Sequence, residues 1–419
     1  MVNSVLSTFD AELDNRSWQS WLKEQLYRLP GFPKPTHSAF LSRFGFLLPA
    51  LNEVGVEVRT YKPSGKDLEG ELKHLEEEIQ SADIVIHNHS LMRRSSSREL
   101  ASRTDSLIRE KYLHKAHTTT GCDKTYIARR MEEAGIPIPM TMEVTDYLAQ
   151  SDGNERVVLK AKELSLGELV LYLDREQVKR FFDEATCRGR GVHPKDMPKP
   201  EWFFVQEFIE APGDRFTSYR IFTVGDEILG GVINASGQTK SEIINRTRWS
   251  DKRYQGLIGL FRLHRSRLFT HYQHPADLFG TYPIVSNVAA DGVQIPVFPF
   301  LPFRGRPTPL QKQTLEEHLI DVDKLGKGWP SSGPASLLYD RATRVGRLLT
   351  NYGMIIAGQD WIQDKKGDIY FLEANPVPGL GIFNRLYFGG MAKREVYTQG
   401  ANSLIAAALM RYKVEATTT

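Results

Sequence analysis

Hydrophobic and polar residues follow a helical spacing in some parts of the chain and a strand-like pattern in others. The first 30 residues place tryptophan and leucine at helical spacing, and residues 38–53 repeat that pattern. A short strand is predicted over 56–59, a charged helix over about 66–80 and a buried strand over 82–86. This α-β-α-β order predicts a small lobe, residues 1–110, built on a parallel sheet.

A second unit is predicted over residues 111–201. Asp123 is a suitable N-cap for a helix that Gly135 and Pro137 would end. The elements expected in this unit are a helix over 124–134, strands over 140–144, 156–161 and 168–173, and a helix over 175–186.

The third unit, residues 202–419, is predicted to open with a strand over 202–209. Further expected elements are a hairpin of strands 217–224 and 227–234, helices at about 335–350 and 399–411, and a second hairpin between these helices. Residues 250–345 are rich in aromatic, proline and basic residues with little periodicity, so they are interpreted as an elaboration within this unit.

The second hairpin, within residues 358–379, carries the most informative chemistry. A turn centred on Lys366 and Gly367 would place Asp360 directly opposite Glu373, with Asn375 two residues further along the same face. Opposed carboxylates repel each other, and oxygen ligands of this kind suit a hard cation such as Mg²⁺. A solvated hairpin is the alternative, and a register slip of one residue would separate the two acids.

Composition indicates an ordinary soluble globular protein. Of 419 residues, 41% are hydrophobic and 25% charged, and the net charge of +3 is too small to indicate a nucleic-acid or membrane partner. The two cysteines have no metal-type or disulfide spacing, the N-terminus does not resemble a signal peptide, and no run of apolar residues is long enough to span a membrane. We therefore expect a cytoplasmic protein.

Several basic and acidic residues are candidates for binding a nucleotide. Lys160, at the end of an apolar strand, and Lys124, in the first turn of a helix, could each contact a phosphate. The strand end from Glu207 to Glu210 could pair with an adenine edge and with ribose hydroxyls. Each signal also fits a solvated surface residue.

Three arginines are weaker candidates for clamping a phosphate: Arg220, Arg246 and Arg248. The segment His87-Asn88-His89 follows a buried strand and, with Arg93 and Arg94, could bind an anionic or carboxylate substrate. A polar loop over a sheet explains the histidine segment at least as well.

The order of these pieces along the chain is more specific than any one of them. Residues 124–139, 158–160, 205–210 and 219–225 are followed by Asp360 and by Phe371-Leu372-Glu373-Ala374-Asn375-Pro376. This order resembles the ATP-grasp superfamily, which includes D-alanine–D-alanine ligase, glutathione synthetase and the ribosomal-protein glutamate ligases. The resemblance covers roughly residues 112–249 and 335–384.

The resemblance implies a fold of mixed α/β and α+β class, in which an N-terminal parallel-sheet lobe precedes two α+β lobes that sandwich ATP. It implies that ATP and one or two Mg²⁺ ions, or Mn²⁺ in their place, are cofactors. The implied ligands are Lys124 and Lys160 for the phosphates, Glu207 and Ile209 for adenine, Glu210 or Asp214 for ribose, and Asp360, Glu373 and Asn375 for the metal.

The implied reaction is ATP-dependent ligation of a small-molecule carboxylate to an amine through an acyl phosphate. Some of these ligases carry an arginine two residues before the first metal acid, where this chain has Gly358, so Arg220, Arg246 or Arg248 would have to stabilise the reaction intermediate. The elaboration would shape a substrate pocket or an oligomer contact, which leaves a homodimer open. A small-molecule kinase and a nucleotide-binding regulator without turnover are the alternatives.

Overall fold

The structure is a computed structural model, and it describes a large part of the chain. The described residues are 1–9, 47–64, 67–89, 92, 96–118, 124–150, 156–162, 170–183, 199–245, 293–298, 309–318, 333–376 and 394–413. The predicted helix of the first 30 residues, apart from its start, lies outside this set, as do Arg93, Arg94, Arg246, Arg248 and most of residues 250–345.

The first lobe is built on a four-stranded parallel sheet with the strand order β2-β1-β3-β4. Its strands are β1 (Ser4–Ser7), β2 (Glu57–Thr60), β3 (Ile84–His87) and β4 (Ala116–Thr118). The prediction of helix at the start of the chain is wrong, because residues 4–7 form a strand between β2 and β3. Val5 and Leu6 are completely buried there. The segment is too short to show a periodicity of its own, so its strand conformation is determined by tertiary packing.

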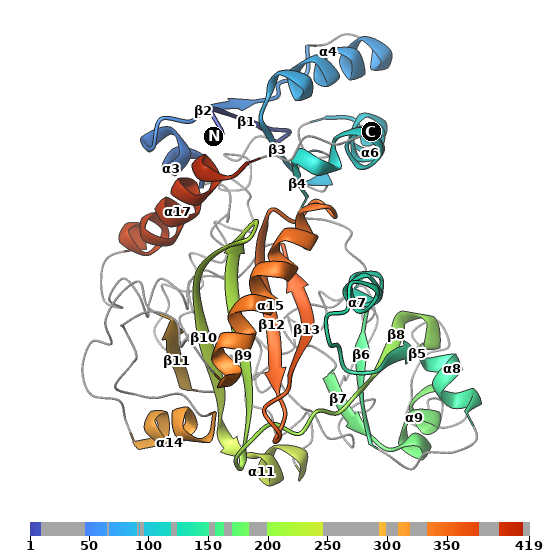
Figure 1. Cartoon of the computed structure of the whole chain (residues 1–419). Helices are drawn as coiled ribbons and strands as arrows, with labels where there is room; N and C mark the ends of the chain where they lie inside the picture. The colour runs from blue at the N-terminus through green and yellow to red at the C-terminus, as the bar shows by residue number, and fades with distance from the viewer. Residues whose placement is uncertain are drawn as a thin grey trace, which may run out of the picture.

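Helices cover this sheet, and one of them comes from the other end of the chain. They are α3 (Leu47–Glu53), α4 (Leu68–Ser81), α6 (Arg98–Leu107) and α17 (Arg394–Arg411). Asp67 caps α4 by accepting a hydrogen bond from the backbone N–H of Gly70. The C-terminal helix α17 lies beside α3, and the backbone N–H of Val2 donates to the carbonyl of Met410 at 3.0 Å (Figure 1).

The second sheet is antiparallel, with the strand order β5-β8-β6-β7. Its strands are β5 (Thr141–Glu143), β6 (Val157–Ala161), β7 (Val170–Leu173) and β8 (Phe203–Glu207), and its helices are α7 (Lys124–Glu133), α8 (Val144–Ala149) and α9 (Arg175–Phe182). A capping box of Asp174 and Gln177 fixes the start of α9. Strand β8 thus belongs to the second sheet, although its residues follow position 201.

The third sheet is antiparallel and has the strand order β11-β10-β9-β12-β13. Its strands are β9 (Arg215–Val224), β10 (Glu227–Thr239), β11 (Val293–Phe298), β12 (Ile356–Gln363) and β13 (Ile369–Asn375), accompanied by α11 (Lys240–Asn245), α14 (Pro309–Glu317) and α15 (Gly333–Thr350). Helix α15 packs on one face, where Trp361 and Tyr219 are buried in a core with Leu338 and Val345.

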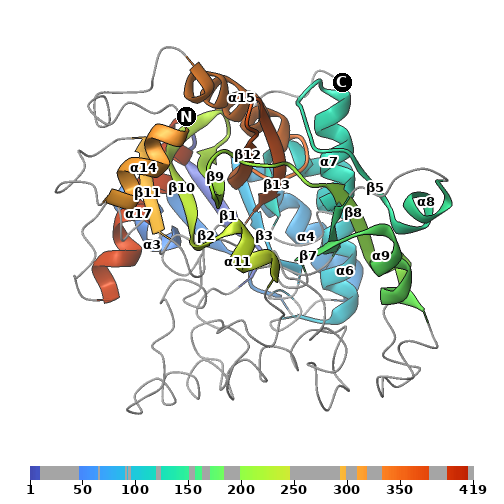
Figure 2. The same cartoon turned by 90° about the horizontal axis from the view of Figure 1, so that it is seen from below.

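Backbone hydrogen bonds are among the contacts that join the third sheet to the other units. The backbone N–H of Phe371 donates to the carbonyl of Pro137 at 2.9 Å, so strand β13 lies beside α7 and faces the second sheet (Figures 1 and 2). The backbone N–H of Thr118 donates to the carbonyl of Gly353 at 2.7 Å, which ties β4 to the segment that enters β12. One parallel-sheet lobe followed by two antiparallel α+β lobes is the predicted fold class, which is confirmed.

Candidate functional site

The hairpin of β12 and β13 places Asp360 opposite Glu373, as predicted from the sequence. Asn375 pairs with Gly358, two residues along both strands, and therefore lies on the same face of the sheet. The turn is closed by Asp364, whose side chain accepts hydrogen bonds from the backbone N–H groups of Lys366 and Asp368, each at 2.8 Å.

The register of this hairpin is not uniform, which differs from the symmetric turn expected from the sequence. Next to the turn, Trp361 pairs with Phe371, whereas Asp360 pairs with Glu373, so Leu372 is an extra residue in β13. Phe371 and Glu373 would share a face in a regular strand. The bulge turns Phe371 into the core beside Trp361 and leaves Glu373 on the opposite face with Asp360.

A row of three charged residues crosses three neighbouring strands on this face. Arg220 on β9 pairs with Asp360 on β12, which pairs with Glu373 on β13. The Arg220 guanidinium donates from Nε to Oδ1 of Asp360 at 2.7 Å and from Nη2 to Oδ2 at 2.6 Å. Burial raises the pKa of Asp360, and the Arg220 charge opposes that rise. This two-point contact fixes the direction of both side chains.

Lys124 lies at the first position of α7 and reaches across to the third sheet. Its Nζ atom is 2.9 Å from Oε2 of Glu373. Burial alone would raise the pKa of Glu373, but Lys124, Lys160 and Arg220 together lower it to about 2. Glu373 is therefore ionised at neutral pH, and it is shared between cations of two different lobes.

Lys160 approaches the same carboxylates from strand β6 of the second sheet. Its ammonium donates to Oε1 of Gln206 at 2.6 Å, and the Gln206 amide donates in turn to Oγ1 of Thr141 at 3.0 Å. Burial lowers the pKa of Lys160 to about 8, against the raising effect of Glu373. The chain of hydrogen bonds holds the ammonium in one direction at the end of an apolar strand.

Three cations, Arg220, Lys124 and Lys160, thus surround two carboxylates, which leaves one positive charge in excess. In the described part of the chain, no group of three or more His, Cys, Asp or Glu side chains could hold a metal ion. Asp360, Glu373 and Asn375 nevertheless supply the oxygen ligands that Mg²⁺ prefers, and Mg²⁺ commonly completes its coordination with phosphate oxygens and water. The arrangement fits a magnesium ion that arrives with a polyphosphate.

The residues predicted to bind adenine and ribose lie where β8 leaves the second sheet. The backbone N–H of Glu207 donates to the carbonyl of Met140 at 2.8 Å, and Ile209 is buried. Glu210 is exposed and forms an ion pair of 2.6 Å with Lys365 in the turn of the β12–β13 hairpin. Asp214 is also exposed, at the end of the following turn. These four residues lie in the stretch that runs from the end of β8 to the start of β9.

The remaining candidates are not brought into this site. Arg246 and Arg248 lie outside the described residues. His87 is buried in the first lobe, where Thr8 contacts its Nδ1 at 2.8 Å and Asp105 lies 3.3 Å from its Nε2, and the ring of His89 contacts the carbonyl of Ala101. His87 is the last residue of β3 and is completely buried, which fits neither an open anion site nor a loop over the sheet. His89 lies after the strand and is partly buried, so the interpretation as a polar loop fits that residue only.

One residue of the site was missed in the sequence. Gln206 follows the three apolar residues Phe203–Val205 of β8 and is buried, with only 3% of its surface exposed. A polar residue at a core position of a strand is a signal in itself, because a buried amide requires hydrogen-bond partners. Its partner on β6 depends on the pairing of β6 with β8, which local patterns do not determine.

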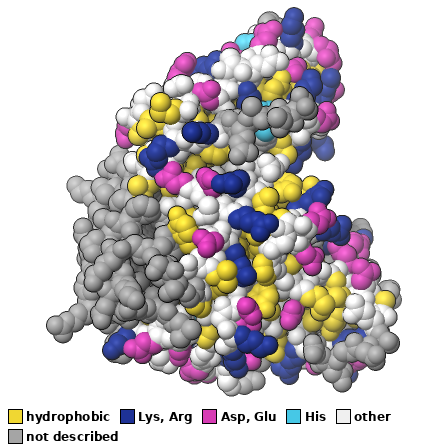
Figure 3. Space-filling view, viewed as in Figure 1, with side chains coloured by type: hydrophobic (Ala, Val, Ile, Leu, Met, Phe, Trp, Pro, Cys, Tyr) yellow, Lys and Arg dark blue, Asp and Glu magenta, His cyan; other side chains and the backbone are white. Residues whose placement is uncertain are grey.

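The described surface is mixed in charge, in keeping with the net charge of +3. Lys and Arg side chains lie among Asp and Glu side chains over the face shown in Figure 3. Within the described residues, none of the helices has the length and apolar character needed to cross a membrane.

Comparison with known proteins gives solved structures only, since neither a family model nor a curated protein matches the chain. The macrocyclase MdnC of Microcystis aeruginosa MRC, bound with the precursor peptide MdnA, is similar at 13% identity over 98% of this chain and 99% of that one, with a TM-score of 0.40. A RiPP-associated ATP-grasp ligase of Chryseobacterium gregarium, in complex with ADP and a leader and core peptide, is 11% identical over 99% of this chain and 98% of that one, with a TM-score of 0.40. The ATP-grasp ligase PsnB, complexed with a minimal precursor, is 10% identical over 98% of this chain and 100% of that one, with a TM-score of 0.43.

Proposed function

We propose that this chain is an ATP-dependent carboxylate–amine ligase, which forms an amide or peptide bond through an acyl phosphate and releases ADP and phosphate. The observation that carries the proposal is the row Arg220–Asp360–Glu373 facing Lys124 and Lys160. A paired set of acids with an excess of cations suits a bound polyphosphate and its metal ion better than it suits a structural ion-pair cluster.

In this proposal the nucleotide lies between the second and third sheets. Lys124 and Lys160 would bind its phosphates, Glu207 and Ile209 would contact adenine through the backbone, and Glu210 or Asp214 would hold the ribose. Asp360, Glu373 and Asn375 would hold one or two Mg²⁺ ions, or Mn²⁺ in their place. The metal would neutralise charge on the phosphate oxygens during transfer.

Arg220 would act on the reacting group. Two of the five N–H groups of its guanidinium bind Asp360, and others would stabilise the negative oxygens of the acyl phosphate and of the tetrahedral intermediate. Because Asp360 holds the Arg220 guanidinium in one orientation, the remaining N–H donors would be oriented before the substrate binds.

The proposed reaction needs no protein nucleophile, because each bond that forms is matched by one that breaks. A carboxylate oxygen of the first substrate forms a bond to the γ-phosphorus of ATP as the bond to ADP breaks. The amine of the second substrate then attacks the acyl carbon, phosphate leaves, and the amine loses a proton to solvent. The substrates proposed are a small amino acid, a peptide or a related metabolite, and we propose that the protein acts in the cytoplasm.

Trapping of the intermediate tests the proposal. With a screen of amino-acid pairs, ADP and phosphate should appear only when both an acid and an amine are present, and hydroxylamine should convert the acyl phosphate to a hydroxamate. Failure to form a hydroxamate with any acid that supports turnover would contradict the proposal. A stable phosphorylated product without release of phosphate would identify a phosphotransferase instead.

A further inference from the structure

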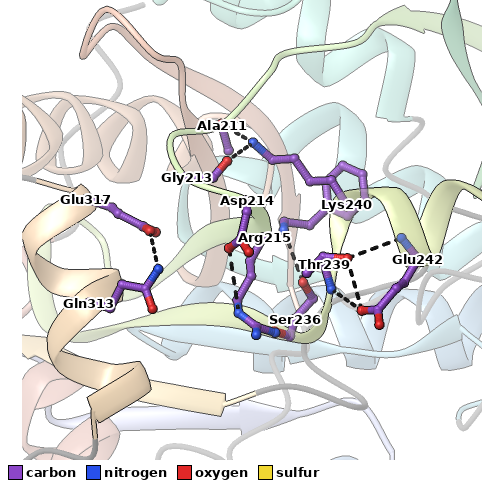
Figure 4. A network of polar contacts seen from close by, with 11 residues as sticks. Ala211, Gly213, Asp214, Arg215, Ser236, Thr239, Lys240, Glu242, Gln313 and Glu317 are labelled. Carbon is purple, nitrogen blue, oxygen red and sulfur yellow. Dashed lines mark hydrogen bonds and ion pairs between the residues drawn. The ribbon is translucent and has the colours of Figure 1, made fainter.

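Lys240 makes several contacts to the turn that follows β8. Its ammonium donates to the carbonyl of Gly213 at 2.6 Å and to the carbonyl of Ala211, and its backbone N–H donates to the carbonyl of Asp214 at 2.7 Å (Figure 4). One residue thus binds three of the four carbonyl groups in the turn Ala211–Asp214. The turn itself comes directly after Glu210.

The local structure brings Lys240 to this position. Between the pairs Ala235–Thr217 and Thr239–Arg215 strand β10 advances by four residues while β9 advances by two, so the register is broken just before Lys240. Thr239 and Glu242 then form reciprocal hydrogen bonds that fix the start of α11, with Glu242 accepting from the Thr239 backbone N–H at 2.8 Å.

A lysine at the first position of a helix is locally unfavourable, because its charge opposes the helix dipole. Here the ammonium is compensated by the carbonyl oxygens of the turn and by the nearby carboxylates of Glu210, Asp214 and Glu317. The contacts with the turn therefore account for the Lys240 ammonium at this position, where the helix dipole alone would disfavour it.

The other side of the turn is supported by α14. Gly213 has a left-handed backbone, with φ of 70°, and a Cβ atom at this position would overlap the carboxylate of Glu317. Gln313 holds that carboxylate by donating to it at 2.8 Å (Figure 4). The turn is thus enclosed between Lys240 and a helix of the elaboration.

We infer that Lys240 is a positioning residue for the nucleotide, which fixes the turn Ala211–Asp214 so that Glu210 or Asp214, which flank or end it, presents its carboxylate to the ribose hydroxyls. The inference rests on the proposed function, since it requires a nucleotide at this edge. It assigns to Lys240 a role that acts through the turn and without direct contact to the phosphates.

Binding of two nucleotides tests this role. Calorimetric titration should show that the wild-type protein binds MgADP about tenfold more tightly than Mg-2′,3′-dideoxyADP, as expected for hydrogen bonds to charged groups. In Lys240→Met this preference should fall to about twofold, with little change for the dideoxy nucleotide. Lys312→Met, which removes an exposed lysine of α14 that pairs with Glu316 at 3.7 Å, should keep the full preference.

A second variant reaches the same turn without changing Lys240. Gly213→Ala places a Cβ atom against Glu317 and strains the left-handed backbone, so it should reduce the ribose preference in the same way. If thermal melting shows that Lys240→Met does not fold, the inference is tested by the ribose preference of Gly213→Ala alone. A full ribose preference in the folded variants, or an equal loss for both nucleotides, would overturn the inference. A wild-type protein that binds neither nucleotide would contradict the proposed function itself.

Discussion

Arg220 and Asp360 form a two-point ion pair between neighbouring strands, with N–O distances of 2.7 and 2.6 Å. Only 12% and 13% of the two side chains is exposed, so the pair is largely shielded from water and from screening by salt. A planar guanidinium matches both carboxylate oxygens at once. The pair therefore fixes the direction of the Asp360 carboxylate relative to Arg220, and the guanidinium charge favours its ionised form.

Replacement of Arg220 by lysine tests the importance of that geometry. Arg220→Lys keeps the positive charge but cannot bind both oxygens, so kcat/KM for the acid substrate should fall about 100-fold, as for loss of a preorganised donor. Affinity for ADP should change much less. Steady-state kinetics and calorimetric titration measure the two quantities. Arg347→Lys is the matched control, since Arg347 forms an exposed pair of 2.9 Å with Asp226 at a distant surface. Equal losses in the two variants would argue against a special role for Arg220.

Replacement of Glu373 by glutamine removes one metal ligand and the partner of Lys124. Glu373→Gln should raise the Mg²⁺ concentration needed for half-maximal activity about tenfold, which corresponds to one charge-assisted contact. The Mg²⁺ dependence of ADP release measures this shift. Glu133→Gln, on the exposed side of α7 where Glu133 pairs with Arg130, should leave the Mg²⁺ dependence unchanged. The same Mg²⁺ requirement in Glu373→Gln as in wild type would remove Glu373 from the metal site.

Activity should depend on the protonation of Lys160. Burial lowers its pKa to about 8, so in the free protein the ammonium loses its proton as the pH rises through about 8. Because only the charged form attracts phosphate, kcat/KM for ATP should fall above that pH. Lys160→Arg should remove this fall, since a guanidinium stays charged over the whole range, even if the activity is lower throughout. A pH profile from 6 to 10 measures both proteins, and the same descending limb in the variant would assign the titration to another group.

The sequence predicts most of the hairpin but not its irregularity. Apolar residues on both sides of a polar turn indicate the two strands, and the turn residues place Asp360 opposite Glu373. The bulge at Leu372 is not visible in that pattern, because strict alternation would put Phe371 and Glu373 on one face. The bulge is explained by packing: it buries Phe371 beside Trp361 and keeps Glu373 on the opposite face, next to Asp360.

Contacts between distant segments could not be predicted from local patterns. The short strand Ser4–Ser7 is stabilised by two neighbouring strands that come much later in the chain. Gln206 meets Lys160 because β6 pairs with β8. Lys240 reaches its turn through a break in register and the packing of α14. In each case the deciding energy comes from tertiary pairing, which a window of neighbouring residues does not contain.

His318, directly after α14, connects the elaboration to the third sheet through buried hydrogen bonds. Its Nε2 lies 2.8 Å from Oγ1 of Thr217, and its Nδ1 lies 3.1 Å from Oε1 of Gln363. Burial lowers the pKa of His318 to about 4, against the effect of Gln363. Below about pH 6.5 the unfolded chain takes up a proton that folded His318 does not bind until about pH 4, so the free energy of unfolding should fall as the pH decreases through this window.

Urea denaturation between pH 4.5 and 8 measures this dependence. One differential proton corresponds to a slope of about 1.4 kcal/mol per pH unit. His318→Gln should be less stable than wild type at pH 8, by about 1–3 kcal/mol for a disrupted buried network, and its stability should vary less with pH because the titrating group is gone. Lys312→Gln, on α14, changes an exposed charge that pairs with Glu316 and leaves His318 in place, so it should keep the wild-type slope. An unchanged slope in His318→Gln would show that α14 does not bury this histidine against the sheet.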